Sequence, residues 1–181
     1  MMHGEADLDG VLTVLEEGLQ ALGIDYQNCG INLLDVSTDP PVMRSRSSAP
    51  GGGWITSDTP RAVQAVHDMW RRQTPTYRRD LHVDDPFDER PYLQTRAPIR
   101  AVVDLPFSHG TLALNSTTPS AFSDADLLLL QEISGVLSSG FQRIDDLRRL
   151  AQSEERYRTL IETPDFIVLL LDPAGNYIYV A

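Results

Sequence analysis

The sequence predicts an α+β fold, in which an antiparallel sheet carries helices mainly on one side and a long helix follows the sheet. Two alternating segments, Arg100 to Ser108 and Thr111 to Thr117, are joined at His109-Gly110, which is a tight hairpin signal. From Ser123 to about Glu162, apolar residues recur three and four positions apart, as they do in one long helix. The expected order is helix, two strands, helix, strand, long loop, hairpin and helix, which favours an antiparallel sheet.

The N-terminal segment is expected to form an amphipathic helix that ends at Gly23, a residue suited to a helix C-terminus. Its apolar stripe consists of Leu8, Leu12, Leu15, Leu19 and Leu22. A largely buried strand over Cys29 to Val36 and a shorter strand over Val42 to Ser47 are expected next. The Ser, Pro and Gly residues of Ser47 to Gly53 then predict a loop.

The middle of the chain predicts one helix, one strand and one long loop. Thr59 as N-cap and Pro60 at the first helical position begin a helix whose apolar face should cover the sheet. A strand is expected over Thr76 to Leu81. The loop from His82 to Pro98 contains at most a short helix near Arg90 to Gln94, and loops of this length often carry function.

The long helix is expected to begin at Ser123, because Asp126 three residues later gives the spacing of a capping box. At about 1.5 Å per residue it would be roughly 60 Å long, so its far end should project beyond the domain. We interpret its apolar stripe as a coiled-coil dimerisation seam. The seam consists of Leu130, Ile133, Leu137, Phe141, Ile144, Leu147 and Ala151.

Composition excludes several classes of function. The net charge of −11 disfavours a nucleic acid partner. The chain contains no lysine, which rules out Schiff-base chemistry on a lysine. Cys29 is the only cysteine, so no disulfide can form within the chain, and a reducing compartment fits. No apolar run is long enough to span a membrane, and Met1 to Gly10 does not resemble a signal peptide, so we expect a cytoplasmic protein without membrane contact.

The order and length of these segments resemble a GAF domain over about Leu8 to Arg149. The resemblance rests on "GINLLDV", "TYRRDL" and above all "HGTLALNSTTPSAFSDADLLLLQEISGVLSSGF". From Ser153, "SEERYRTLIETPDFIVLLLDPAGNYIYVA" is similar to the opening of a PAS domain that stops after two strands, at Phe166 to Leu171 and Tyr177 to Val180. We therefore expect a GAF core over residues 1–122, a closing and linker helix over 123–162, and an incomplete PAS start over 163–181, as in bacterial sensor histidine kinases.

The resemblance implies a regulatory module that binds a small molecule between the sheet and the long loop, or that serves as a dimerisation unit. Of the two neighbouring arginines of the expected strand, Arg79 is the chosen ligand group, because it shares a face with Tyr77 while Arg78 points the other way. Core packing is the alternative for Trp54, Trp70 and Tyr77, and a surface ion pair is the alternative for Arg79 and Asp104. The candidate ligand residues are Trp54, Trp70, Tyr77, Arg79, Tyr92 and Asp104.

No cofactor is identified from the sequence. The four histidines have no metal-ligand spacing, and Cys29 lies in an apolar strand where a buried inert thiol is expected. Neither a metal site nor a covalently attached bilin is therefore expected. The leading hypothesis is a non-catalytic sensory module that forms a homodimer through its N-terminal and long C-terminal helices. The alternatives are a structural spacer that binds no ligand and, more remotely, a methionine sulfoxide reductase, a branch that relies on more than one cysteine.

Overall fold

The computed structural model describes residues 5–48, 53–57, 59–93, 97–162 and 169–180. The chain forms two compact units, Met1–Ser139 and Gly140–Ala181. The first unit contains a six-stranded antiparallel sheet with the strand order β3-β2-β1-β6-β5-β4. The strands are β1 (Asn28–Asp35), β2 (Val42–Ser47), β3 (Ile55–Thr56), β4 (Thr76–Arg78), β5 (Ala101–Phe107) and β6 (Gly110–Ser116).

The predicted hairpin is the centre of the sheet. Strands β5 and β6 pair from Ala101↔Ser116 to Phe107↔Gly110, and β6 pairs on its other side with β1. Gly110 is required at the turn because a Cβ atom there would collide with the carbonyl oxygen of Asn32 on β1. The hairpin prediction is confirmed, and its strands are among the most buried in the chain.

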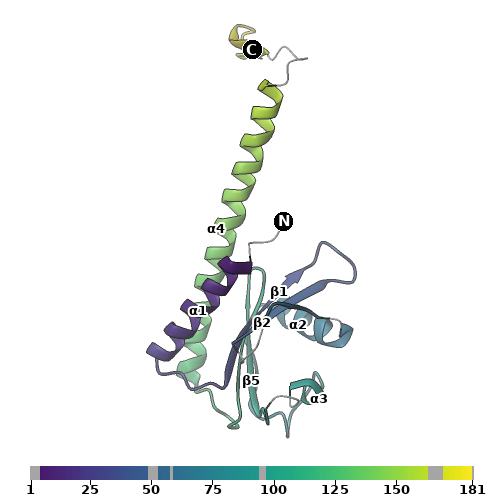
Figure 1. Cartoon of the computed structure of the whole chain (residues 1–181), viewed down its shortest axis with the longest axis vertical. Helices are drawn as coiled ribbons and strands as arrows, with labels where there is room; N and C mark the ends of the chain where they lie inside the picture. The colour runs from purple at the N-terminus through teal and green to yellow at the C-terminus, as the bar shows by residue number, and fades with distance from the viewer. Residues whose placement is uncertain (1–4, 49–52, 58, 94–96, 163–168, 181) are drawn as a thin grey trace. The chain divides into compact units, whose positions relative to one another are not determined.

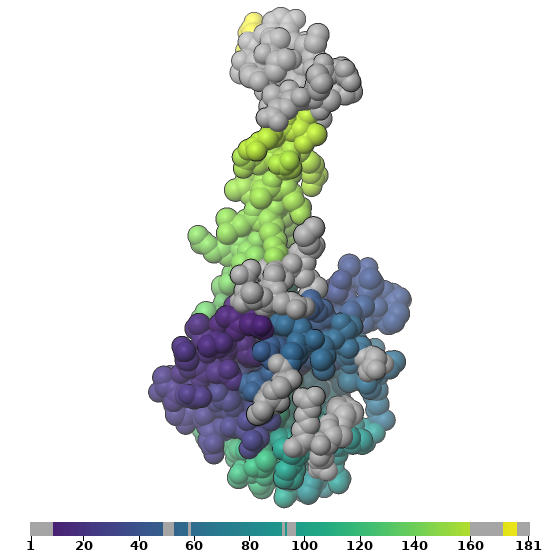
Figure 2. All heavy atoms as spheres, in the orientation of Figure 1, coloured from purple at the N-terminus to yellow at the C-terminus, as the bar shows by residue number. Residues whose placement is uncertain are grey.

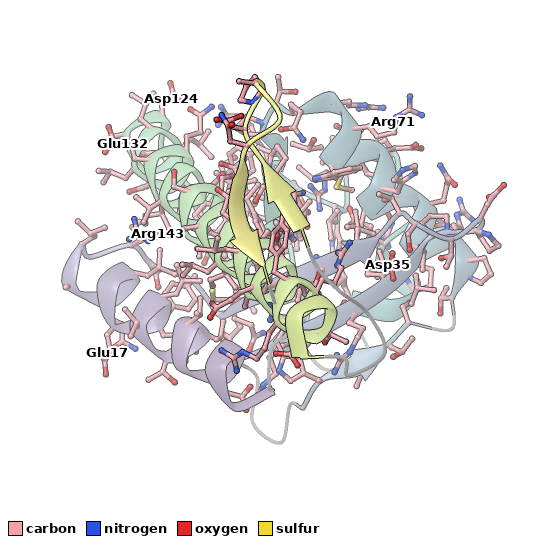
Figure 3. The ribbon with its side chains drawn as sticks, turned by 90° about the horizontal axis from the view of Figure 1, so that it is seen from above. Glu17, Asp35, Arg71, Asp124, Glu132 and Arg143 are labelled. Atoms are coloured by element: carbon pink, nitrogen blue, oxygen red, sulfur yellow. The ribbon has the colours of Figure 1, made fainter. Side chains whose placement is uncertain are left out.

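Helices cover both faces of this sheet, whereas the sequence predicted them mainly on one side. Helix α1 (Glu5–Ala21) and the first part of α4 (Asp124–Glu162) lie on one face, and α2 (Pro60–Arg72) lies on the other (Figure 1). Figure 3 places Glu17 of α1 and Arg71 of α2 on opposite sides of the strands. The expectation was wrong because consecutive residues of β5 are buried, which requires cover on both faces.

The apolar core lies between the sheet and the pair α1 and α4. Leu12, Leu15 and Leu19 of α1 are buried against this face, as the predicted helical stripe requires. Strands β5 and β6 contribute four fully buried residues, Val103, Leu105, Leu112 and Leu114. In the space-filling view α1, in purple, forms part of the outer surface of the first unit (Figure 2).

Helix α4 is continuous over 39 residues and begins as predicted. The Ser123 backbone N–H donates to Asp126 Oδ2 at 2.8 Å, and the Asp126 N–H donates to Ser123 Oγ at 3.2 Å, so the capping box is confirmed. Further hydrogen bonds attach the first part of α4 to the β5–β6 hairpin. The Ser134 hydroxyl donates to the Pro106 carbonyl at 2.7 Å, and Ser138 Oγ accepts from the Ser108 N–H at 2.9 Å.

The second unit contains the rest of α4 and a two-stranded hairpin. Strands β7 (Leu169–Leu171) and β8 (Tyr177–Val180) pair antiparallel, and Asp172 closes their turn by accepting the N–H groups of Ala174 and Asn176. The predicted strand at Phe166 to Leu171 is therefore found in its last three residues, while 166–168 lie outside the described residues. Within the described part of the chain, no helix is both long enough and apolar enough to cross a membrane.

Candidate functional site

A row of hydrogen-bonded polar side chains crosses the sheet on the face that α2 covers. Ser45 Oγ on β2 donates to Asn32 Oδ1 on β1 at 2.8 Å, and Asn32 Nδ2 donates to Thr111 Oγ1 on β6 at 3.0 Å. The Thr111 hydroxyl donates to Asp104 Oδ1 on β5 at 3.1 Å, and Asp104 in turn binds Arg78 on β4. Five strands thus contribute one polar side chain each, although side chains between a sheet and a covering helix are usually apolar.

Arg78 is the most buried charged residue of this row, with 1% of its surface exposed. Its guanidinium donates to Glu89 through two parallel bonds, Nε to Oε2 at 2.7 Å and Nη2 to Oε1 at 2.9 Å. Nη2 also donates to Asp104 Oδ2 at 2.7 Å, and Nη1 donates to the Thr76 carbonyl at 2.7 Å. One guanidinium therefore pairs with two buried carboxylates, so this charged cluster has one negative charge in excess when both are ionised.

Burial and neighbouring charges change the pKa values of both Glu89 and Arg78. Burial raises the pKa of the Glu89 carboxyl, and the charges of Asp104 and Asp85 raise it further, although Arg78 acts in the opposite direction. For Arg78, burial alone would lower the pKa, but the attraction of Asp104 and Glu89 outweighs it, and the pKa is raised. The guanidinium is thus fixed as a cation, whereas burial disfavours the charged form of Glu89.

The long loop between β4 and β5 positions Glu89 against the sheet. The Asp85 carboxylate accepts the backbone N–H groups of Glu89 at 2.7 Å and of Arg90 at 3.1 Å, where the short helix α3 (Arg90–Leu93) begins. The Phe87 ring lies beside two guanidinium groups, 5.9 Å from Arg72 of α2 and 5.7 Å from Arg78. Local turn bonds and cation–π contacts therefore place Glu89 over the edge strand β4.

Arg79, the arginine chosen from the sequence, lies just after β4 and takes part in a surface ion pair, which was the alternative considered for it. Arg79 is 59% exposed at its side chain, lies 5.0 Å over the Tyr77 ring, and approaches Asp124 at 3.5 Å. The alternation argument was correct in separating Arg78 from Arg79, and the row of polar side chains lies on the face of Arg78. Tyr77 shares the α4 face with Arg79, where its hydroxyl accepts the Phe122 N–H at 3.0 Å.

The other predicted ligand residues do not converge on one place. Asp104 lies in the charged cluster. Trp54 lies near α1, where its Nε1–H donates to Asp9 Oδ1 at 3.1 Å. Trp70 on α2 donates its Nε1–H to the Phe107 carbonyl at 2.9 Å and stacks on His67. Tyr92 belongs to α3, and its side chain lies outside the described residues.

Sequence reasoning missed Arg78 and Glu89. The pairing Thr76↔Asp104 and Arg78↔Val102 places Arg78 diagonally opposite Asp104 on one face, so knowledge of the register would have identified this arginine. Glu89 lies in a loop without periodicity, and no local pattern marks it as buried.

An apolar groove of about 780 Å³ lies between α1 and α4 within the first unit. Figures 1 and 3 show these helices side by side. The lining includes two glycines and two exposed valines, and Val14 is 69% and Val136 is 73% exposed. The α1/α4 groove is lined by Gly10, Val11, Val14, Leu15, Gly18, Leu22, Leu129, Glu132, Ile133, Val136 and Leu137.

The predicted seam of α4 divides into residues of different exposure. Ile133 and Leu137 line the α1/α4 groove, and Leu147 is 57% exposed. Leu130 is fully buried within its own chain, so its assignment to an intermolecular seam was wrong. Its position one turn before Ser134, which bonds to the β5–β6 hairpin, places it on the helix face that packs on the sheet. Phe141 is 3% exposed and is also no part of an exposed stripe.

Neither a metal site nor a reactive thiol is found in the described part of the chain. No group of three potential ligand residues lies together there. Cys29 is 1% exposed, and burial, together with the charge of Glu16, raises the pKa of its thiol to about 12. A thiol with such a pKa is almost entirely protonated at neutral pH and is a poor nucleophile.

Comparison with known proteins gives structural relatives only. No protein-family model and no curated protein matches the sequence. Solved structures do match. The GAF domain region of a predicted membrane protein from Geobacter sulfurreducens PCA is 19% identical, with a TM-score of 0.55 over 76% of this chain and 92% of that chain. A red/green cyanobacteriochrome in its red light-absorbing state is 12% identical, with a TM-score of 0.61 over 78% and 97%.

A third similar structure is a domain of a predicted two-component sensor histidine kinase protein from Sinorhizobium meliloti 1021. It is 17% identical, with a TM-score of 0.54 over 81% of this chain and 99% of that chain. At these identities the comparison concerns architecture alone. The six-stranded sheet with its flanking helices and long C-terminal helix is the α+β fold of GAF domains.

Proposed function

We propose that this chain is a non-catalytic sensory module of a cytoplasmic signalling protein, and that it dimerises through α1 and α4. The observation that carries the proposal is the α1/α4 groove, which has a volume of about 780 Å³ and an apolar lining between two amphipathic helices. Contiguous exposed apolar surface is typical of a binding interface. The most economical occupant is a second copy of the same two helices, since a two-fold axis brings identical grooves together.

The dimer is tested by native mass spectrometry across micromolar concentrations. The variant Val136→Asp places a charge in the groove at a residue that is 73% exposed, so it should weaken the dimer without unfolding the domain. Gln131→Asp, on an exposed α4 residue outside the groove lining, is the matched control and should remain dimeric. A monomeric wild-type chain would refute the proposed interface.

We further propose that α4 passes a signal to a following PAS-type unit, as in sensor histidine kinases. The continuity of α4 through 39 residues supports this, because one rigid element can carry a change of pairing along its length. The β7–β8 hairpin after α4 supports a PAS start through its similarity to the opening strands of that fold. Structural similarity to domains of signalling proteins points in the same direction.

The ligand-free structural spacer remains the second candidate. The charged cluster favours it, since Arg78, Glu89 and Asp104 already satisfy one another inside the face where a ligand would bind. The two candidates are distinguished by whether a small molecule changes the Arg78 cluster. A methionine sulfoxide reductase is disfavoured by the buried state and raised pKa of Cys29.

A further inference from the structure

We propose that Arg78 is the anchor of a binding site for a small carboxylate, and that Glu89 occupies this site as the chain's own ligand until an external carboxylate replaces it. The inference rests on the sensory function proposed above. It adds the chemical class of the ligand and the route by which binding reaches α4.

Glu89 binds Arg78 in the way that a free carboxylate would. The two parallel bonds, at 2.7 and 2.9 Å, use the fork of donors that makes arginine selective for planar anions. Two further hydrogen bonds of the guanidinium are made to the sheet, through Asp104 Oδ2 and the Thr76 carbonyl, and Nη1 also lies 3.9 Å from Met69 Sδ of α2. These contacts hold Arg78 in position when Glu89 leaves, so the anion site is formed before a ligand arrives.

Besides Glu89, the segment that carries it is attached through Phe87, whose ring lies 5.9 Å from Arg72, and through Leu93, which packs against a small apolar cluster away from α4. The ion pair between Arg61 and Asp88 measures 2.7 Å, but its side chains are 65% and 50% exposed, and such pairs contribute little to stability. On its outer side the segment borders a solvent-facing hollow of about 390 Å³ lined by Asp85, Asp88, Arg90 and Pro91. The loop can therefore release Glu89 without opening the apolar core between the sheet and α4.

The buried guanidinium also selects the class of ligand. A neutral apolar molecule that displaced Glu89 would leave two N–H groups of Arg78 without acceptors, at a large desolvation cost. A phosphate would bring a second negative charge next to Asp104, which already competes for Arg78. A monoanionic carboxylate reproduces both bonds of Glu89 and adds no charge to the cluster.

Strand β4 connects this site to α4. Arg78 faces the charged cluster, while its two neighbours contact the segment where α4 begins. The Tyr77 hydroxyl accepts the Phe122 N–H at 3.0 Å, and the Arg79 carbonyl accepts the Ser120 N–H at 2.7 Å. Because β4 is a three-residue edge strand, release of the Glu89 segment from Arg78 changes what supports this strand and thereby the contacts at the start of α4.

The first test is chemical rescue of Glu89→Ala, in which the missing group corresponds to acetate. Acetate should raise the Tm of this variant, whereas acetamide and an equal concentration of chloride should not. Glu89→Gln serves as an isosteric second variant if the alanine variant unfolds. Acetate should bind this variant about tenfold or more tightly than it binds the wild type, because the competing internal carboxylate is removed. Equal responses to acetate and acetamide, or none in either variant, would overturn the proposal.

The second test asks whether Glu89 is displaced in the wild-type chain. Acetate at high concentration should increase backbone hydrogen exchange of the Asp85–Leu93 segment and should alter exchange at Phe122. No change at concentrations that saturate Glu89→Ala would make Glu89 a fixed structural partner and would refute the exchange. Native mass spectrometry of the same samples separates the carboxylate site from the proposed dimer. A dimer that does not respond to acetate refutes only the carboxylate site. A monomer that still binds acetate refutes only the dimer.

Discussion

At the scale of single residues, Glu89 makes stability depend on pH in an unusual direction. Its pKa is raised above the ordinary value of 4.5, so the folded state disfavours its charged form. The contribution of this group to the free energy of unfolding is therefore greatest below pH 4.5 and declines as pH rises through the folded pKa. Arg78, Asp104 and Asp85 are the charged groups that face it.

Glu89→Gln should remove this dependence, because glutamine stays neutral at every pH. The Tm of the variant minus that of wild type should increase as pH rises from 4.5 toward neutrality, and calorimetry at several pH values measures it. Asp84→Asn, an exposed carboxylate of the same loop, is the matched control and should show no such trend. A difference that falls with rising pH would mean that Arg78 stabilises the Glu89 charge more than burial opposes it.

The neighbouring arginines should respond very differently to the same substitution. Arg78→Gln leaves Glu89 and Asp104 buried without a cation and should lower the free energy of unfolding by about 3–5 kcal/mol. Arg79→Gln removes an exposed ion pair at 3.5 Å and should change it little. Urea denaturation of both variants makes the comparison. Similar losses in the two variants would contradict the burial of Arg78.

At the scale of elements, the capping box of α4 should contribute measurably to stability. Ser123→Ala removes the acceptor of the Asp126 N–H at 3.2 Å and should lower the free energy of unfolding by about 1 kcal/mol. Ser153→Ala, within the same helix and away from its ends, is the control and should have a smaller effect. Equal losses in the two variants would contradict a specific contribution of the cap, because alanine is the better helix former at Ser153.

Elements were predictable from sequence where local chemistry decides them. The hairpin at His109-Gly110 and the start of α4 at Ser123 follow from turn and cap residues, and both agree with the structure. The strand over Thr76 to Leu81 was predicted too long, because β4 ends at Arg78, where the chain turns and Asp80 forms an ion pair with Arg100. Strand ends depend on such long-range partners.

The candidate site was harder to predict than the fold, since its members meet only through sheet register and a loop. Asp104 was identified as polar within an alternating strand, but its bond to Arg78 depends on how β4 pairs with β5. Trp54 and Tyr77 were grouped with it because aromatic residues often line pockets, yet they lie near α1 and α4 instead. Residue type alone does not determine which face of a sheet is polar.

At the scale of the whole molecule, the function depends on whether two copies of α4 pair along their length. Apolar residues remain exposed on this helix beyond the first unit, with Leu147 at 57% and Leu150 at 66%. In a parallel two-stranded seam, identical residues of the two copies face each other and lie close together. The native thiol of Cys29 is buried and should not interfere with engineered cysteines.

This pairing predicts a pattern of cross-linking. Leu147→Cys lies on the predicted seam and should form an intermolecular disulfide in high yield under mild oxidation. Arg149→Cys, which is two residues away and exposed, lies about 200° around the helix and should cross-link poorly. Non-reducing electrophoresis measures both yields. If the sensory role is correct, the disulfide yield of Leu147→Cys should also change when acetate is added to a chain that carries Glu89→Ala. A disulfide yield that is high and insensitive to acetate would favour the structural spacer.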